Sequence, residues 1–481
     1  MPACAVQPPL IQRLDQIMKA PEFRFHTRRE FLRTSMLGGA LAWSVPSFIG
    51  STFDWLGAEA RAADHPNRKD GRDSTVLVVV QLAGGNDGLN TVIPGPNDHY
   101  LKARPRLGVV AREALKLDDE FGLHPALEGL KGLFDDGLLS VVHGVGYPNP
   151  NRSHFRSTEI WQTASDADRS EHYGWLGRYF DHACKGADPL VGVRVGREMP
   201  QAFHSGHPVG VCLENAREYG RPAGDGGRRS GSGGVSDNQP APSMEPGMQG
   251  DGGGDGAGGS SDSVSGSSIA SVGGGQPKGM STIDFVERVS LDAQASTEKI
   301  RELSAKVTNE PGYPSGTLAE GLKLVARLIG GGAPTRVYYV SQGGYDTHTN
   351  QAPAHQRLLT ELGGSVSAFA RDMRKQGNHE RVLLMTFSEF GRRLAENANG
   401  GTDHGAAAPL FLVGGGVRPG LHGAFPSLAP TDLLNGDPRF SVDFRSVYAA
   451  AVRDWLRAPV AQVLGRDFPT LPLLRSPRGV A

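Results

Sequence analysis

Five short runs of apolar residues divide the chain and predict buried β-strands. Each run lies between glycine or polar residues, and its apolar character is continuous instead of alternating. Continuous runs of this kind are typical of strands that are covered on both faces. The predicted strands are 75–82 (TVLVVVQL), 138–143 (LLSVVH), 337–340 (VYYV), 381–387 (RVLLMTF) and 409–413 (PLFLV).

Two segments near the third and fourth strands show helical periodicity. Their apolar positions recur every three or four residues, and Gly330 follows the first segment, where it is suited to end a helix. A strand, a long helix and a strand in succession form a βαβ unit, which implies a parallel sheet with helices on both faces. The chain is therefore predicted to be an α/β protein. The apolar positions are Leu318, Leu322, Val325 and Leu328, then Leu358, Leu362, Val366, Phe369 and Met373.

Residues 1–62 are predicted to be an export signal. Segment 27–33 (TRREFLR) carries two adjacent arginines, an apolar run extends from residue 36 to about residue 50, and residues 60–62 (ARA) suit a signal peptidase. This order resembles a twin-arginine (Tat) signal peptide, so we expect the Tat machinery to deliver a folded mature chain to the periplasm. The run is shorter than the roughly 18–20 residues that span a bilayer, so no transmembrane anchor is expected in the mature chain. An amphipathic helix with a chance arginine pair is the alternative.

A second segment, residues 220–279, is rich in glycine and serine and has almost no large apolar residue. Such a segment cannot bury enough surface to offset the entropy lost on ordering. It is predicted to be a disordered insertion within one domain that spans residues 63–481. Calcium binding by its aspartates is disfavoured, because no regular repeat of glycine and aspartate is present.

The overall composition narrows the function only slightly. Lys and Arg number 50, Asp and Glu number 51, and the net charge is −1, which gives no reason to expect a nucleic-acid partner. Of the three cysteines, Cys4 lies in the predicted signal, and the spacing of Cys184 and Cys212 does not decide whether they pair. The chain has no Cys-x-x-Cys motif, which argues against a thiolate zinc site.

Acidic and imidazole side chains lie next to four of the predicted strands. In open parallel sheets, ligands bind outside the carboxyl ends of the strands, so these side chains are expected at one edge. Carboxylates and imidazoles are the ligands of zinc, manganese and similar ions. Each group alone is compatible with a turn, an ion pair or a helix cap, but together they predict a shared polar site that binds divalent metal ions (zinc, manganese or calcium). The residues are Asp87, Asp346, His348, Glu389, Asp403 and His404.

Five ordered motifs carry a resemblance to a known family. They are VLVVVQLAGGNDGLNTVIP, NPNRSHFRSTEIWQTA, GGYDTHTNQ, TFSEFGRRLAENANGGTDHG and DFRSVYAAAVRDWL. The chain resembles the domain of unknown function (DUF) 1501 family, which is placed in the alkaline phosphatase-like superfamily. The resemblance implies an alkaline phosphatase-like fold with a mostly parallel central sheet. Members of that superfamily include phosphatases, sulfatases and cofactor-independent phosphoglycerate mutases.

The resemblance also implies roles for individual residues. Asp87 would bind one metal, and Asp346 with His348 the other, although the superfamily usually spaces that pair four residues apart. Glu389-Phe390 stands where the superfamily has Asp-His, so a histidine is missing there. The other implied roles are a nucleophile at Ser153, with Ser157 as second choice; a metal ligand at His404, with Asp403 nearby; and a contact with a charged substrate oxygen at Arg152 or Arg392.

By analogy with this superfamily, the chain is predicted to be an exported, metal-dependent hydrolase of a phosphate or sulfate ester. Its substrate would be a small molecule or an envelope component. The alternative is a non-catalytic member of the superfamily that binds a polysaccharide or a cell-envelope component. The missing histidine after Glu389 favours this alternative. An electron-transfer role is poorly supported, because no ligand set for haem or an iron–sulfur cluster is visible.

Overall fold

A computed structural model describes residues 74–184, 188–206, 209–214 and 297–475. The predicted signal peptide, residues 1–62, and the predicted insertion, residues 220–279, lie outside the described residues. Both assignments therefore stay predictions.

The described residues are built around a nine-stranded sheet with the order β13-β5-β12-β9-β1-β8-β6-β7, in which β14 also pairs with β5. All five predicted strands are present in it. The strands are β1 (Val76–Ala83), β5 (Leu139–Gly146), β6 (Gly192–Val195), β7 (Val211–Leu213), β8 (Val337–Gly343), β9 (Val382–Phe387), β12 (Ala408–Val413), β13 (Gly420–His422) and β14 (Val442–Asp443).

The sheet is parallel except at one strand. β1 pairs in parallel with both β8 and β9, and β6 does so with β7 and β8. β12 runs antiparallel to both of its neighbours, β5 and β9. The periodicity of segment 409–413 contained no information on its direction. This direction matters for the site, because the chain enters β12 at the edge where β9 and β1 end.

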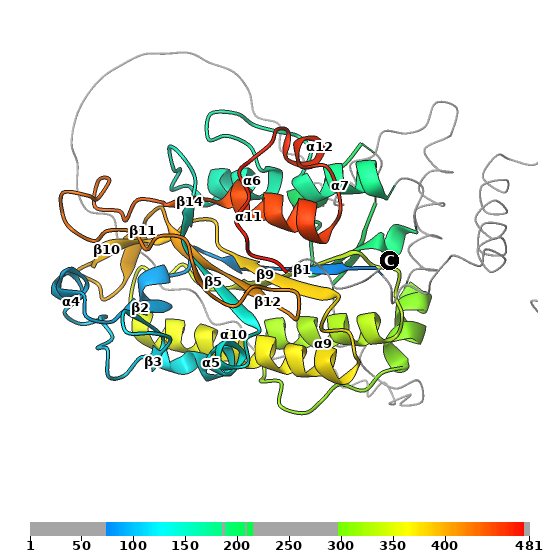
Figure 1. Cartoon of the computed structure of the whole chain (residues 1–481), viewed down its shortest axis with the longest axis horizontal. Helices are drawn as coiled ribbons and strands as arrows, with labels where there is room; N and C mark the ends of the chain where they lie inside the picture. The colour runs from blue at the N-terminus through cyan, green and yellow to red at the C-terminus, as the bar shows by residue number, and fades with distance from the viewer. Residues whose placement is uncertain (1–73, 185–187, 207–208, 215–296, 476–481) are drawn as a thin grey trace, which may run out of the picture. The chain divides into compact units, whose positions relative to one another are not determined.

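Helices cover both faces of this sheet, as Figure 1 shows: α6, α7, α11 and α12 on one face and α5, α9 and α10 on the other. The predicted α/β class, with a mostly parallel sheet between two helical layers, is confirmed. The helices are α5 (Glu128–Asp135), α6 (His154–Thr163), α7 (Trp175–Ala183), α9 (Thr317–Gly330), α10 (Gln351–Lys375), α11 (Phe444–Ala450) and α12 (Val460–Leu464).

β1 illustrates why the predicted strands are apolar throughout. Leu77 and Val79 belong to the hydrophobic core beneath α6 and α7, whereas Val78 and Val80 belong to the core beneath α9 and α10. Successive side chains of a strand point to opposite faces, so a strand covered on both faces needs apolar residues at every position.

Smaller elements lie outside the large sheet. β10 (Arg392–Glu396) and β11 (Thr402–His404) form an antiparallel pair, and β2 (Val92–Pro94), β3 (Leu115–Lys116) and β4 (Phe121–Leu123) form a three-stranded sheet. The short helix α4 (Asp98–Ala103) lies near β10. The β10–β11 hairpin is the chain segment between β9 and β12, so it lies at the edge where the predicted site residues gather.

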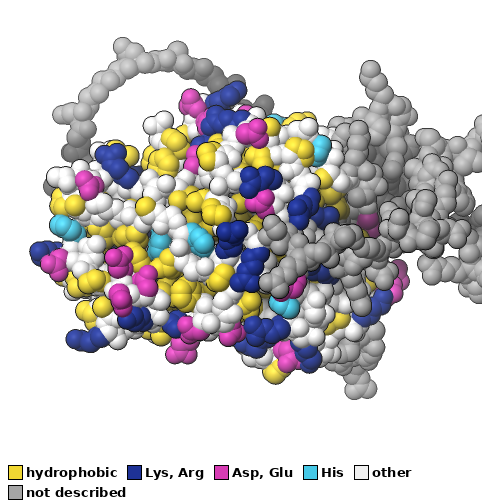
Figure 2. All heavy atoms as spheres, in the orientation of Figure 1, with side chains coloured by type: hydrophobic (Ala, Val, Ile, Leu, Met, Phe, Trp, Pro, Cys, Tyr) yellow, Lys and Arg dark blue, Asp and Glu magenta, His cyan; other side chains and the backbone are white. Residues whose placement is uncertain are grey.

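Three further observations concern membrane spans, the two described cysteines and the charge on the surface. Among the described residues, no helix has both the length and the apolar character that crossing a membrane requires. Cys184 and Cys212 are not bonded to each other. Figure 2 shows basic and acidic side chains interspersed over the face that it draws.

Candidate metal centre

The centre is assembled by loops that follow neighbouring strands. β1 lies between β9 and β8, and these three strands run in the same direction. The loops after them therefore meet at one edge of the sheet, as expected for open parallel sheets. His404 lies at the same edge for a different reason. It ends β11, and the antiparallel strand β12 begins at this edge a few residues later.

Asp346, His348 and His404 lie together at this edge. The Nε2 atoms of His348 and His404 are 2.9 Å apart. The Oδ1 atom of Asp346 is 3.1 Å from the Nε2 atom of His404 and 3.1 Å from that of His348. These three potential ligand atoms thus form a nearly equilateral triangle.

A fourth side chain, His154, joins this cluster and was not among the residues named from the sequence. Its Nε2 atom is 3.4 Å from Oδ2 of Asp346, and one ligand atom each from His154, Asp346 and His404 lie within 4.8 Å of one another. His154 is the first residue of α6 and directly follows Ser153. That adjacency to the predicted nucleophile was the only sequence signal for it, because no fixed spacing connects it to the other ligands.

The Nδ1 atoms of all three histidines face hydrogen-bond acceptors. Carboxylates and backbone carbonyls accept hydrogen bonds, so each acceptor can hold a proton on Nδ1, and in that tautomer Nε2 would offer its lone pair to an ion. In metal sites, ligating histidines are held by outer hydrogen bonds of this kind. The acceptors are the Arg152 carbonyl for His404 (2.8 Å), Oδ1 of Asp403 for His348 (3.2 Å) and Oε1 of Glu389 for His154 (3.0 Å).

This arrangement fits a divalent cation. In the tautomer with Nδ1 protonated, the Nε2 lone pairs and the Asp346 carboxylate would converge on one point, where a cation could bind all of them. Zn–N and Zn–O bonds are about 2.0–2.2 Å long, so two ligand atoms on one ion lie roughly 3 Å apart. The observed separations of 2.9 and 3.1 Å agree with that geometry. Nitrogen and carboxylate oxygen ligands suit zinc or manganese.

Asp346 is ionised in this setting. Burial raises the pKa of its carboxyl group, but contacts with His404 and with the Arg392 guanidinium lower that pKa to about 2. Its side chain is still 47% exposed, so the centre is open to solvent on one side.

Arg392 does not face the solvent, where it was expected to contact a substrate oxygen. Its side chain is fully buried. Its guanidinium donates hydrogen bonds to Oδ1 of Asp346 (2.9 Å) and to four backbone carbonyls, and because the side chain is enclosed it cannot contact a substrate. Arg392 therefore joins the loops after β1 and β8 to β11. The accepting carbonyls are those of Gly84, Gly85, Tyr345 and Thr402.

Glu389 lies behind His154 as an acceptor. Its Oε1 atom accepts from the backbone N–H of Gly84 at 2.8 Å and from Nδ1 of His154 at 3.0 Å. Its Oε2 atom is buried and has no hydrogen-bond partner among the described residues. Phe390, which follows it, packs its ring on His154 and His404, with centroid distances of 4.9 and 4.4 Å.

Asp87, the predicted first metal ligand, lies in a separate buried network. Its carboxylate is fully buried and pairs with Nη1 of Arg104 at 2.6 Å. Gln351 also donates to it, and Asp87 caps the 3-10 helix at Gly88–Asn90. Burial raises the pKa of this carboxyl group, but the opposing effects of Arg104, His355 and the hydrogen bonds leave it below its usual value. The structure does not bring Asp87 into contact with the histidines.

The two candidate serines differ in accessibility. Ser153 is exposed and is the N-cap of α6, and its side chain makes no capping hydrogen bond. Ser157 is buried, contacts the Tyr147 hydroxyl at 2.8 Å and donates to the Glu389 carbonyl. It therefore fixes α6 to the loop after β9 and is enclosed. Arg152 is partly exposed and pairs with Asp437.

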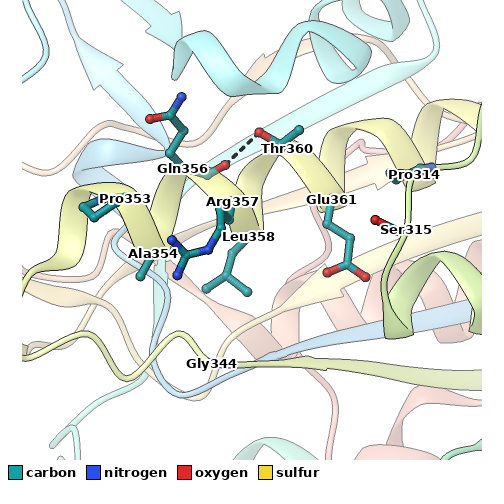
Figure 3. A pocket seen from close by; sticks show the side chains of 10 residues that line it. All are labelled: Pro314, Ser315, Gly344, Pro353, Ala354, Gln356, Arg357, Leu358, Thr360 and Glu361. Carbon is teal, nitrogen blue, oxygen red and sulfur yellow. Dashed lines mark hydrogen bonds between the residues drawn. The ribbon is translucent and has the colours of Figure 1, made fainter.

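A recess of about 800 Å³ opens beside the same loop, between α10 and residues 314–315 (Figure 3). Gly344, two residues before Asp346, lines it, and the side chains of Arg357 and Glu361 extend into it. None of the cluster residues lines this recess, which lies on the α10 side of the loop.

The fold and the cluster together define an α/β protein with a candidate His–Asp metal centre at the edge of its sheet. Residues 286–439 match the model of a family described as "Protein of unknown function (DUF1501)". The resemblance to that family is confirmed over this segment, which contains β8, β9, β10 and β11. No curated protein matches the sequence.

Several solved structures are similar to this chain, with low TM-scores and low sequence identity. One is a sulfatase from Pseudoalteromonas sp., with 8% identity, a TM-score of 0.31, and 81% of this chain and 74% of that chain covered. Another is a protein in the alkaline phosphatase superfamily from Vibrio parahaemolyticus, with 9% identity, a TM-score of 0.29, and coverage of 73% and 62%. A third is a phosphonate monoester hydrolase from Silicibacter pomeroyi, with 10% identity, a TM-score of 0.30, and coverage of 82% and 77%.

Proposed function

We propose that this chain is a metal-dependent hydrolase that cleaves a phosphate or sulfate ester. The observation that carries the proposal is the convergence of His154, His348 and His404 on Asp346, with each outer imidazole nitrogen held by an acceptor. An exposed serine, Ser153, directly precedes one of these histidines. Metal-dependent ester hydrolysis can use a bound cation together with an accessible hydroxyl, so both features support this proposal.

The ligands of the ion would be the four converging side chains. When bound, a divalent ion supplies Lewis acidity that stabilises negative charge on the oxygens of the ester. Glu389, Asp403 and the Arg152 carbonyl fix the imidazole rings from outside. Arg392 holds Asp346 in place and balances its charge.

Ser153 would supply the nucleophile. Its hydroxyl oxygen would form a bond to phosphorus or sulfur while the bond to the ester alcohol breaks, and the alcohol would leave with the proton. Water would then cleave the serine ester and release phosphate or sulfate. The N-terminus of α6, a ten-residue helix that Ser153 precedes, favours negative charge at this point. Arg152, which is partly exposed, is the remaining candidate for contact with a substrate oxygen.

A metal titration followed by calorimetry tests this proposal. If the ion binds only the native state, a hundredfold excess over the dissociation constant should stabilise the protein by about 2.7 kcal/mol. His404→Ala and His348→Ala should each lower metal content and remove this gain. Ser153→Ala should keep both the fold and the metal but lose hydrolysis of aryl phosphates and aryl sulfates. Unchanged metal content in both histidine variants would contradict the metal centre, and retained activity in the serine variant would exclude the nucleophile.

A second candidate function is a non-catalytic protein that binds a polysaccharide or a cell-envelope component. It is favoured by the position of Asp87, which was predicted to bind one of two metal ions. Because Asp87 pairs with the buried Arg104, one group of candidate metal ligands remains instead of two. In that case, wild-type protein would bind the ion but cleave neither class of ester.

The twin arginines at positions 28 and 29 support export through the Tat pathway to the periplasm. The double variant Arg28→Lys/Arg29→Lys should then remain in the cytoplasm. Normal export of this variant would contradict the assignment.

A further inference from the structure

Two arginines share a single aspartate beside the candidate metal centre. Asp437 is buried, and its Oδ2 atom accepts hydrogen bonds from Nη2 and, at 3.1 Å, from Nε of Arg152. Its Oδ1 atom is 3.5 Å from Nε of Arg393. Among the described residues, neither arginine forms another ion pair. One positive charge in this trio is therefore not balanced within it.

Both arginine side chains are partly exposed. The side chain of Arg152 is 37% exposed and that of Arg393 is 36% exposed. Within the described part of the chain, most of their N–H groups are uncommitted, since the other side-chain hydrogen bond made by either is from Nη2 of Arg393 to the Asn435 carbonyl at 2.9 Å. The nearby carboxylate of Asp403 forms hydrogen bonds with His348 and Asn397, and the charge of Arg393 contributes to lowering its pKa, so Asp403 offsets part of the positive charge of Arg393.

The trio is connected directly to the metal centre. The backbone carbonyl of Arg152 accepts the hydrogen bond from His404, and Ser153 is the next residue. Arg393 follows Arg392 on β10, opposite β11 and His404. Each arginine is thus the chain neighbour of a residue at the centre, Arg152 of Ser153 and Arg393 of Arg392.

A second cluster, of two arginines and two aspartates, shows such arginines with their charges balanced. Asp166 pairs with Arg445 and with Arg466, but Arg445 also pairs with Asp443. Two carboxylates therefore meet two guanidinium groups. The side chain of Arg466 is 55% exposed and provides a matched arginine away from the metal centre.

We propose that Arg152 and Arg393 form an anion-binding subsite, which takes a second phosphate or sulfate group on the substrate of the neighbouring centre. This inference rests on the proposed function, because the first anionic group is the ester at the metal centre. Guanidinium groups bind tetrahedral oxyanions through paired, charge-assisted hydrogen bonds, which favours this class of ligand. The preferred substrate is thus an ester with at least two anionic groups.

Binding of matched ligands to the metal-loaded full chain tests the subsite without requiring turnover. The probes are fructose 6-phosphate against fructose 1,6-bisphosphate, and a monosulfated against a disulfated disaccharide. Titration calorimetry should show that the bis-anion of at least one pair binds about tenfold more tightly than its mono-anion, and the pair that does so identifies phosphate or sulfate. Arg393→Gln should reduce this ratio to about twofold, and Arg393→Lys should restore part of it.

Arg466→Gln is the matched control and should leave the ratio at the wild-type value. The melting temperature of each variant shows whether it is folded, and Arg152→Gln provides a second route to the same result. A ratio near one in the wild-type protein, or a ratio unchanged in both Arg393→Gln and Arg152→Gln, would overturn the subsite. Tight binding of a bis-anion without any cleavage would support the subsite while contradicting hydrolysis.

Discussion

Asp87 and Asp346 follow neighbouring strands of one sheet, yet their surroundings are opposite. The carboxylate of Asp87 is fully buried against the equally buried Arg104, at 2.6 Å. The carboxylate of Asp346 is 47% exposed and faces three imidazole Nε2 atoms. A buried charge must be paired and hydrogen bonded, so Asp87 is committed to its partner. Asp346 keeps an open side, so it can take a ligand.

The histidines near the two carboxylates differ in the same way. His355 lies in the network of Asp87, where burial lowers its pKa to about 4, and its Nε2 atom contacts Asn86 at 2.9 Å. It is therefore neutral at physiological pH and fixed within the protein interior. His404 is held from behind by the Arg152 carbonyl, so its Nε2 atom faces the solvent-accessible cluster. Acid and imidazole side chains thus form a buried structural network after β1 and a candidate metal site after the neighbouring strand β8.

Replacing each aspartate by asparagine should give the largest difference between the two sites, in stability at one and in metal content at the other. Asp87→Asn removes the charge opposite Arg104 and leaves that guanidinium buried without its partner, which should lower the free energy of unfolding by about 3–5 kcal/mol. Metal bound per folded molecule should not change. Urea unfolding and metal analysis of the folded fraction provide both measurements.

Asp346→Asn is the matched variant for that comparison. It should reduce metal content strongly but lower the free energy of unfolding of the metal-free protein by less than Asp87→Asn does, because the Asp346 carboxylate is 47% exposed and the buried Arg392 keeps its hydrogen bonds to four backbone carbonyls. If Asp87→Asn lost its metal while Asp346→Asn kept it, the assignment of the two sites would be reversed.

The sequence predicted the sheet well because burial on both faces gives continuous apolar runs. It also indicated which loops would meet, since the ends of parallel strands share one edge. On that basis Asp346, His348 and His404 could be named together, and the structure places them within contact of one another. Their role as ligands remains a proposal.

Other features depend on packing that the sequence pattern does not encode. The pairing of Asp87 with Arg104 is a contact across a loop and a short helix, and no periodicity signals it. His154 enters the cluster from the start of α6, a helix that packs on the core through Trp161, which stacks on Phe444 with a centroid distance of 4.3 Å. The antiparallel direction of β12 is likewise a tertiary property, since an apolar run reads the same in either direction.

Arg392→Lys should have a smaller effect, and it tests whether a single buried guanidinium links the two loops. Lysine keeps the positive charge but replaces a planar fork of five donors by one ammonium group, so it cannot reach all the carbonyls that Arg392 contacts. The free energy of unfolding should fall by about 1–2 kcal/mol. Because Asp346 loses its outer hydrogen bond, metal affinity should fall by about tenfold.

Metal titration of the folded variant measures this change, and Arg371→Lys, at an exposed position on α10, provides the control. Wild-type metal affinity in Arg392→Lys would show that Asp346 is positioned without this arginine.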